Sequence, residues 1–403
     1  MKKALFLAVL CICTVSVWAD DGFDGIIFMP EEKEPFRFKN RMIELGHKAN
    51  VGFANDFLTF GEIFRDTVVI DMNSLQDGLR LNMDAIVSPF FFNFNRNDLW
   101  GFGIFVNTEA YGNMMISGKM LTISEAENDK LGLGAAVFAE VGGQAFFYIK
   151  KFKVKIKTSL FYPLLYTEPD ISYTFKSNTE TFEVNIKYDM LIYTAIPMEG
   201  LLEGNGGGGL TAQPGFDFGG SVEYPLFPFL DLGAEITHFP LVPAALNDYM
   251  HITGSFGIEE TDDIFKLVDN IDDLFSTDSG DTSYGTGKKT ILRPFKLLTY
   301  AEYRPFNNRL LSVIPSLGFA INPLYIKPFS MEGGIKARTD IANIFIATLG
   351  INYEDRLWKN SVDIALNLRA FELDLGLALQ SQKLGTSWKG SGLGASVGIK
   401  FGW

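Results

Sequence analysis

The last thirteen residues of the chain, 391–403, constrain its fold more than any other stretch. Large apolar side chains occupy every second position there, at Leu393, Ala395, Val397, Ile399, Phe401 and Trp403. A period of two places all of them on one face of a strand. The positions between them hold glycines, one serine and one lysine, which is little charge for a face in water. The pattern favours a strand with lipid on one side and a lumen on the other over the edge strand of a soluble sheet.

The first residues have the features of an export signal. Two lysines precede an apolar run over residues 4–17, which is too short to span a membrane, and Ala19 ends a small-x-small cleavage pattern. We therefore expect residues 1–19 to be a cleaved signal peptide. Cys11 and Cys13, the two cysteines of the chain, lie inside this segment. The mature protein should then have no disulfide, no cysteine nucleophile and no cysteine-bound metal.

Composition narrows the class of protein further. The formal net charge of -13 argues against a nucleic-acid partner, whose phosphates attract basic surfaces. Hydrophobic residues make up 47% of the chain, which is enough for a large buried or lipid-facing surface. No later stretch has eighteen apolar residues without charge, so no transmembrane helix is predicted. An exported soluble domain and an outer-membrane barrel remain, and the terminal strand favours the barrel.

Alternating stretches recur along most of the chain and are long enough for tilted membrane spans. The parity of the alternation changes at Arg369–Ala370, as it does across a tight hairpin. We predict an all-β, antiparallel transmembrane β-barrel of about 14 strands, formed by residues 20–403 as one domain. The strands predicted for the last third are 293–304, 311–323, 330–339, 343–353, 361–369, 371–381 and 391–403.

Two segments between the strands have helical rather than alternating patterns. Phe57, Phe60 and Phe64 follow one another at helical spacing behind Asn55 and Asp56. They predict a short helix within an N-terminal hatch, or plug, of about residues 20–75. A second amphipathic helix lies within a long acidic loop of about residues 257–290, and its apolar positions are Ile264, Leu267, Val268, Ile271, Leu274 and Phe275.

No stretch of the chain indicates an enzyme, and we predict no catalytic residue, cofactor or metal. The match to G-x-S-x-G at 394–398 lies inside the most regular strand, where the sharp turn of a nucleophile elbow does not fit. His238 and His251 flank a proline-rich turn and could share a metal, but histidines of a barrel rim or strand explain them more simply. A barrel-borne lipid hydrolase would need a Ser/His pair that the sequence does not locate.

Four lysines alternate along one predicted strand, at positions 151, 153, 155 and 157. Their charges would repel one another unless water or anions screened them, and a lysine facing lipid at the bilayer midplane costs about 2–4 kcal/mol. A solvated lumen wall or periplasmic rim is the simpler interpretation. The alternative is a cationic wall in which Lys153, Lys155 and Lys157 hold an acidic headgroup.

Three stretches together resemble a known type of outer-membrane barrel: GHKANVGFANDFLTFGEIF at 46–64, RPFKLLTYAEYRPF at 293–306, and the terminal strand. The chain resembles the long-chain fatty-acid transporter type, and more closely the FadL-like barrels of spirochaetes. The resemblance implies a barrel of about fourteen strands with an N-terminal hatch in its lumen and hydrophobic ligands passing through. The hatch of that family carries an Asn-Pro-Ala motif, whereas Asn55-Asp56 here lacks the proline.

Two functions follow as hypotheses. The first is passive transport of hydrophobic compounds such as long-chain fatty acids, with Phe57, Phe60 and Phe64 forming an apolar wall of the ligand pocket. The second is a non-transport barrel that acts in surface interaction, secretion or assembly. The expected partners are outer-membrane lipid, a hydrophobic small molecule such as a fatty acid and the barrel-assembly machinery, and nucleic acid is not expected. A Phe-lined pocket beside the hatch would favour transport, and a tightly plugged lumen with large outer loops would favour a surface role.

The terminal strand generates a first prediction, because Phe401 and Trp403 resemble the aromatic signal that ends outer-membrane barrels. Deleting residues 401–403 should sharply lower the amount of protein in the outer membrane and leave an unassembled, protease-sensitive chain. Outer-membrane fractionation and heat modifiability on gels measure the outcome. A truncated protein that still assembles at the normal level would contradict the assignment of this signal.

Overall fold

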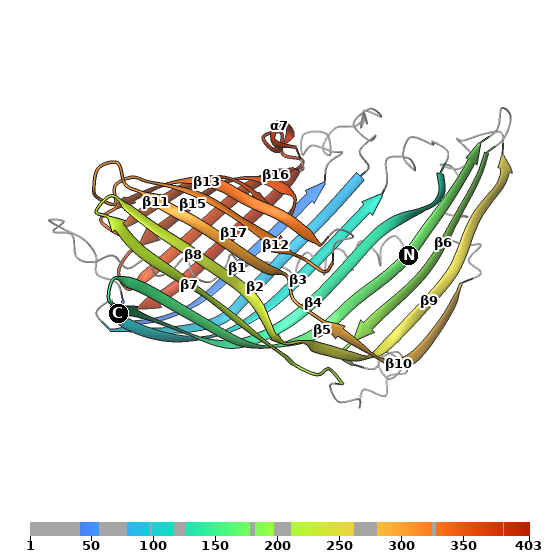
Figure 1. The fold of residues 1–403 in the computed structure, drawn as a ribbon, viewed down its shortest axis with the longest axis horizontal. Coiled ribbons are helices and arrows are strands. Elements are labelled where there is room, and N and C mark those ends of the chain that lie inside the picture. Colours follow the sequence, from blue (N-terminus) through green and yellow to red (C-terminus); the bar gives the residue numbers. More distant parts are fainter. Residues whose placement is uncertain are drawn as a thin grey trace.

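The computed structural model describes most of the chain as one antiparallel sheet (Figure 1). The described residues are 41–55, 79–96, 99–116, 126–177, 182–196, 211–261, 280–324, 328–381 and 383–403.

The sheet contains seventeen strand segments within these residues, and one short helix accompanies them. The first nine segments are β1 (Ile43–Asn55), β2 (Leu79–Arg96), β3 (Trp100–Ile116), β4 (Ala126–Ile149), β5 (Phe152–Ser177), β6 (Phe182–Thr194), β7 (Gly215–Phe227), β8 (Leu230–Val242) and β9 (Ala244–Thr261). The remaining elements are β10 (Asp281–Ile291), β11 (Phe295–Tyr303), β12 (Ser312–Ile321), β13 (Phe329–Ile341), β14 (Phe345–Glu354), β15 (Leu357–Asn367), β16 (Phe371–Ser381), α7 (Leu384–Ser387) and β17 (Gly392–Gly402).

The sheet closes on itself because β1 pairs with a strand on each side. Leu45 of β1 lies opposite Phe92 of β2 on one side and opposite Phe401 of β17 on the other. The terminal strand is thus the closing strand of the barrel, as its alternation predicted. The predicted all-β antiparallel barrel is confirmed, and its last seven strands fall within a few residues of their predicted bounds.

The structure has seventeen strand segments where about 14 strands were predicted. The difference arises because three neighbouring lines of strand along the barrel wall, which we call courses, are each divided into two segments. β6 and β7 pair with β5 one after the other. β9 continues the course of β8, and β11 continues the course of β10. The breaks fall at 195–214, at Pro243 and at 292–294. They lie side by side, and we call this part of the wall the kink region.

The two ends of the barrel differ in the length of their connections. At the end that holds Trp403 the connections are short, such as 150–151 and 228–229. At the other end they are longer, such as 56–78 and 262–280. Outer-membrane barrels place short turns on the periplasmic side and long loops outside. We therefore name the two ends the periplasmic end and the outer end.

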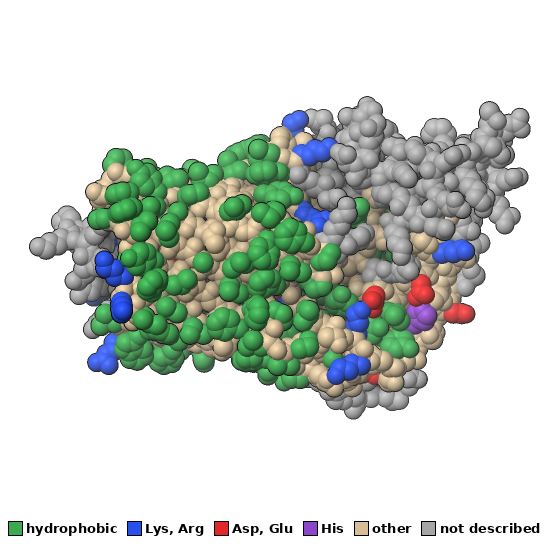
Figure 2. Space-filling model, viewed as in Figure 1, with side chains coloured by type: hydrophobic (Ala, Val, Ile, Leu, Met, Phe, Trp, Pro, Cys, Tyr) green, Lys and Arg blue, Asp and Glu red, His purple; other side chains and the backbone are tan. Residues whose placement is uncertain are grey.

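The exterior of the barrel is apolar. On β3 the side chains of Trp100, Phe102, Ile104 and Val106 are exposed, while the residues between them are buried. Figure 2 shows hydrophobic side chains covering the visible face of the barrel between its two ends, with charged side chains gathered toward its margins. A lipid-facing surface requires this arrangement, because a charge in the hydrocarbon is costly.

Aromatic side chains border this apolar band at both ends. The ring ladder at the outer end crosses four strands through Phe239, Phe295, Phe319 and Phe329, with neighbouring centroids 5.8–5.9 Å apart. Tyr303, at the periplasmic end of β11, packs on Phe229 at 6.0 Å. The nine residues of β11 from Phe295 to Tyr303 rise about 21 Å along the axis at a tilt of roughly 40°. This height is close to the band of about 25 Å that such barrels bury in lipid.

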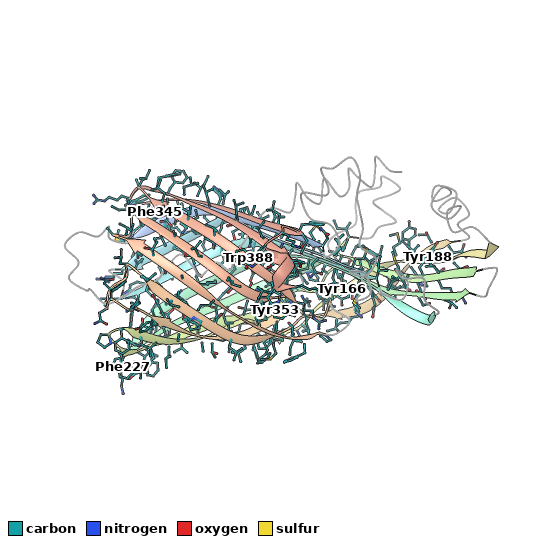
Figure 3. All side chains as sticks on the ribbon, turned by 90° about the horizontal axis from the view of Figure 1, so that it is seen from above. Tyr166, Tyr188, Phe227, Phe345, Tyr353 and Trp388 are labelled. Carbon is teal, nitrogen blue, oxygen red and sulfur yellow. The ribbon has the colours of Figure 1, made fainter. Side chains whose placement is uncertain are left out.

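Beyond the outer belt the wall continues on one side only. The halves of β4 and β5 nearer the outer end extend together with β6, β9 and β10 past the ends of the other strands (Figure 1). Figure 3 shows Tyr188 of β6 at the far end of this extension, away from Phe227 and Phe345 at the periplasmic end. We call this part the outer extension.

Several predicted segments differ from the structure or lie outside the described residues. The acidic loop predicted at about 257–290 is shorter, because β9 continues to Thr261 and β10 already begins at Asp281. The signal peptide at 1–19, the predicted helices at 56–67 and within 262–280, and most of the hatch at 20–75 lie outside the described residues. Within the described residues, no helix is long and apolar enough to cross a membrane.

The lipid-facing band generates a second prediction. Leu349 lies at the middle of β14 with 57% of its surface exposed, halfway between Phe345 and Tyr353. Changing Leu349 to Lys should destabilise the folded barrel by about 2–4 kcal/mol, because the ammonium group would lie near the bilayer midplane. Urea unfolding in phospholipid vesicles measures the change.

The matched control is the neighbouring position Thr348, which has the opposite parity and lies opposite Asp363. Thr348→Lys should change the stability by less than about 1 kcal/mol, because it faces the lumen, where Asp363 on one side offsets Arg338 on the other. Equal losses in the two variants would show that the assigned faces of β14 are wrong.

Candidate functional site

The predicted lysine row faces the lumen. Lys153 and Lys155 are buried, and they alternate along β5 with outward residues such as Phe152. Lys153 Nζ lies 2.7 Å from Glu223 Oε2, and Lys157 Nζ lies 3.3 Å from Glu140 Oε1. Two of the three predicted headgroup lysines therefore already pair with carboxylates on neighbouring strands.

The structure does not bring these lysines together with the predicted phenylalanine strip. Phe57, Phe60 and Phe64 lie outside the described residues, between the end of β1 at Asn55 and the start of β2 at Leu79. Their role in a ligand pocket stays a prediction.

The most concentrated polar site within the described residues surrounds one arginine, Arg293. Its guanidinium donates through Nη1 to Glu140 Oε1 at 3.0 Å and to Asp217 Oδ2 at 3.2 Å. Its Nε donates to Glu109 Oε2 at 3.2 Å, and Nη2 also contacts the Glu109 carboxylate. Nη2 donates in addition to His238 Nε2 at 2.7 Å. We call these five residues the Arg293 cluster.

All five side chains of the Arg293 cluster are buried, and the most exposed, His238, shows only 6% of its surface. Isolated charges could not remain ionised at such burial, so the mutual pairing is what permits them. Further bonds hold the carboxylates in place. Asn107 donates to Glu140 Oε2 at 2.7 Å, and Tyr111 donates to Glu109 Oε2 at 3.2 Å. The cluster therefore forms a sealed polar layer in the lumen.

The kink region explains how the cluster assembles. Thr237 of β8 lies opposite Lys296 of β11, and Ala244 of β9 lies opposite Ile291 of β10. The six residues 238–243 of one course therefore face the four residues 292–295 of the other. The excess residues form a bulge that begins at His238, whose φ is 50°. This left-handed conformation is uncommon for a residue other than glycine. A bulge redirects side chains, and here it accompanies a histidine and an arginine that meet in the lumen.

An apolar layer lies next to the polar one. Phe138 and Glu140 point inward from β4, two residues apart, and Phe161 of β5 stacks over the guanidinium with Arg293 Cζ 5.4 Å from the ring centroid. The same buried cluster includes Tyr193, Leu246 and Ile291. We call Phe138, Phe161, Tyr193, Leu246 and Ile291 the apolar mouth cluster, because it lies where the barrel meets the outer extension.

The connection between β12 and β13 reaches across the outer end of the lumen. Leu324, in this connection, packs against the apolar mouth cluster. A Cβ atom added to Gly134 of β4 would lie 2.7 Å from the Leu324 carbonyl oxygen. Only a glycine permits so close an approach, so Gly134 allows the connection to rest on the opposite wall.

A cleft beside Leu324 is lined by both apolar and polar side chains. Its volume is about 340 Å³ including its opening to solvent. Its lining residues are Asn82, Met83, Asp84, Tyr111, Gly112, Asn113, Asn322, Leu324, Asp355 and Leu357.

Other charges in the lumen also occur in matched groups. At the periplasmic end Lys400 lies 2.8 Å from Glu372 and 2.9 Å from Asp374, and Arg41 lies 2.8 Å from Glu372. Arg304 contacts Asp231 in the same part of the barrel. These groups show that the lumen wall is charged but locally compensated.

The remaining candidates from the sequence are also located. His251 of β9 bonds to Asp189 at 2.7 Å, whereas His238 belongs to the Arg293 cluster, so the two histidines have different partners. Ser396 of the G-x-S-x-G match lies within the regular ladder of β17, opposite Asn50 and Gly376. It has no turn geometry of a nucleophile elbow.

No protein-family model matches this sequence, and no curated protein matches it. Among solved structures, the chain is similar to outer-membrane transporters of the FadL type. The toluene transporter TbuX of Ralstonia pickettii shares 10% identity at a TM-score of 0.47, over 91% of this chain and 90% of that one. The toluene transporter TodX of Pseudomonas putida shares 9% at 0.46, over 89% of both chains. A FadL homologue of Pseudomonas aeruginosa shares 8% at 0.44, over 90% of both. These neighbours are of the type that the sequence resembles.

The Arg293 cluster was not predicted from the sequence. Arg293 and Glu109 are 184 positions apart, and each is an isolated charge in its own stretch. One local signal was present, since Arg293 precedes a proline between two alternating runs. A proline there removes one hydrogen bond of the strand pairing, so the arginine next to it does not have to follow the alternation of inward and outward side chains.

The cluster generates a third prediction. Changing Arg293 to Met should lower the free energy of unfolding by about 3–5 kcal/mol, because three buried carboxylates would lose their shared cation. Adding Glu109→Gln and Glu140→Gln to this variant should restore part of the loss. Urea unfolding in detergent or vesicles measures both.

Lys296 provides the comparison, since its pairs with Asp355 at 3.1 Å and Glu332 at 3.6 Å leave 27% of its side chain exposed. Lys296→Met should cost about 1 kcal/mol or less, as expected for a solvated pair. If Arg293→Met is no more destabilising than Lys296→Met, the cluster does not depend on its arginine.

Proposed function

We propose that the protein is an outer-membrane barrel through which hydrophobic compounds pass passively. The observation that carries this proposal is the apolar mouth cluster, a layer of aromatic and aliphatic side chains inside a barrel whose lumen also holds many charged and polar groups. A channel for ions or sugars needs a continuous aqueous path. Here the outer end offers apolar surface instead, and Leu324 covers it from the opposite wall.

The order of the two layers supports selection of apolar solutes. A hydrophobic molecule that replaces Leu324 on Phe138 and Phe161 gains contact with apolar surface, at about 25 cal/mol per Å² buried. A hydrated ion gains nothing there. In the Arg293 cluster behind this layer the guanidinium already occupies the position between the carboxylates, so a passing ion would have to displace it.

The class of solute is the finer part of the proposal. Long-chain fatty acids fit an apolar layer followed by cationic side chains, since Lys153 and Lys157 lie farther down the same face of β5 as Phe161. An acidic headgroup would have to displace Glu223 or Glu140 from these lysines. A neutral hydrocarbon would need no such exchange. Transported solutes of both kinds are therefore compared in the experiment below.

A second function is favoured by the outer extension. Strands β4, β5, β6, β9 and β10 continue beyond the lipid-facing band, and the polar layer seals the lumen beneath them. A barrel that acts in surface interaction, or as an accessory in secretion or assembly, would have these features without passing any solute. The two functions differ in whether the cover over the apolar mouth cluster has to move.

A disulfide can test whether the cover moves. A Cβ on Gly134 would lie 3.6 Å from Leu324 Cβ, within the range that disulfides span, once the Leu324 carbonyl oxygen, 2.7 Å from that Cβ, has moved away. No cysteine follows Cys13 in the chain, so Gly134→Cys/Leu324→Cys would introduce the only pair after that point. Oxidation should suppress uptake of a labelled fatty acid or a labelled aromatic hydrocarbon by cells that produce the variant, and reduction should restore it.

The reduced form of the same variant is the control for assembly, and each single cysteine variant is the control for the substitutions. Suppression of fatty-acid uptake alone would identify acids as the solutes, and suppression of both would indicate a general hydrophobic path. If uptake is equal in oxidised cells, reduced cells and cells without the protein, the transport proposal is wrong and the surface role stands.

A further inference from the structure

We propose that the Arg293 cluster is a binding site for a divalent transition-metal ion, with Glu109, Glu140 and His238 as ligands. The guanidinium of Arg293 takes the position of the cation when no metal is bound. The proposal concerns the cation that the cluster holds and is independent of what passes through the barrel.

The ligand atoms have the spacing of a metal site. One carboxylate oxygen each of Glu109 and Glu140 and one ring nitrogen of His238 lie within 4.8 Å of one another. All three side chains are buried and come from different strands. Carboxylate oxygen and imidazole nitrogen are common ligands of zinc, and an ion of this size bonds them at about 2.0–2.2 Å. A small contraction around a central ion would bring the three atoms to that distance.

The hydrogen bonds of His238 fix the ring in the form that binds metal. A guanidinium only donates hydrogen bonds, so His238 Nε2 must accept from Arg293 and carries no proton. The proton is then on Nδ1, which donates to the carbonyl oxygen of Pro294 at 3.3 Å. Metal-binding histidines typically have this second bond from the other ring nitrogen to a carbonyl or carboxylate. The lone pair on Nε2 is directed at the position that the guanidinium occupies.

The charges of the cluster also favour a doubly charged ion. Glu109, Glu140 and Asp217 are three carboxylates, and among the described residues two cations, Arg293 and Lys157, form ion pairs with them. When all three are ionised, one negative charge is uncompensated while the guanidinium is in place. A divalent ion in the same position would neutralise the group.

Asp217 supplies a second, independent sign of an unfilled bonding position. Its side chain is 1% exposed, and its Oδ2 accepts from Arg293, yet its Oδ1 has no hydrogen-bond partner. A buried carboxylate oxygen without a partner is costly. Asp217 lies outside the group of three ligand atoms that are within 4.8 Å of one another, but it shares Arg293 Nη1 with Glu140 and so borders the position that the metal would take.

Arg293 is placed so that it can leave. It lies in the three-residue connector between β10 and β11, outside the ladder of either strand, and is followed by Pro294. Movement of the connector therefore breaks no regular strand pairing. Because the connector belongs to the kink region, exchange of the guanidinium for a metal would also alter the wall at the outer end.

The test measures binding of zinc to the refolded full-length barrel in detergent, without a histidine tag. The chain has three histidines, so a His47→Ala/His251→Ala background leaves His238 as its only imidazole. In this background, Arg293→Ala should bind a single zinc ion at least about tenfold more tightly than the parent, because the competing cation is gone. Further change of His238 to Ala should abolish this binding. Bound cobalt should show a visible absorption band of tetrahedral coordination that disappears with His238→Ala.

Arg304→Ala is the matched control. Arg304 is also buried and contacts two carboxylates, Asp231 and Glu302, but no histidine. Its removal should not raise zinc affinity. If folded Arg293→Ala binds zinc no better than Arg304→Ala, the proposal is overturned.

Arg293→Ala could fail to fold, and the parent protein then decides the question. It should bind zinc more weakly, at higher concentrations, and lose this binding on His238→Ala. A parent that binds no zinc at any concentration at which the barrel remains folded would also overturn the proposal.

Discussion

The structure depends on the requirement that every backbone polar group within the lipid has a partner in the sheet. β1 meets this requirement by pairing with β2 on one edge and β17 on the other, so no edge is left in the membrane-spanning part of the ring. The bonds continue to the ends of the strands, where Met42 N donates to the Trp403 carbonyl oxygen at 2.8 Å. Irregular backbone is tolerated only where water or protein can satisfy it. The kink region accordingly lies at the outer end, next to the aromatic ladder of Phe239 and Phe295 rather than midway down the band.

The same requirement explains why the lumen holds so many paired charges. Strand parity divides every course into a lipid face and a lumen face, and the lumen face must take all the charged residues. Lys153 and Lys157 are an example, because they would repel each other alone but pair with Glu223 and Glu140 across strands. The lysine row of β5 looks like a cationic wall when this strand is considered alone, but carboxylates of the neighbouring strands compensate the charge of these two lysines.

Local features of the strands and turns could be predicted well from the sequence, whereas the long-range contacts inside the lumen could not. Alternation located the closing strand, and the parity change at Arg369–Ala370 located a hairpin in which Arg369 has a φ of 69°. These features are set by neighbouring residues. The breaks between β6 and β7 and between β10 and β11 cannot be told from ordinary strand ends in the sequence, because a broken course and a turn have the same local signature. The Arg293 cluster joins residues of four strands and of the connector between β10 and β11, and no local pattern records which lumen-facing charges meet after closure.

The kink region and the Arg293 cluster are two aspects of one structural solution. Three broken courses lose ladder bonds that would otherwise hold the wall, and a bulge at His238 adds backbone that needs support. Arg293 provides it, because one planar group with five donors reaches carboxylates on β3, β4 and β7 and the histidine at the bulge. Arg304 also bonds carboxylates, but it follows β11 at the periplasmic end, away from the break at 292–294. Ion pairs and hydrogen bonds between side chains thus stabilise the wall at the kink region, whereas backbone hydrogen bonds between strands stabilise the rest of the barrel. A wall held in this way can change shape when one cation moves, whereas a continuous ladder cannot without breaking many bonds. Any conformational change in the barrel should therefore begin at the kink region.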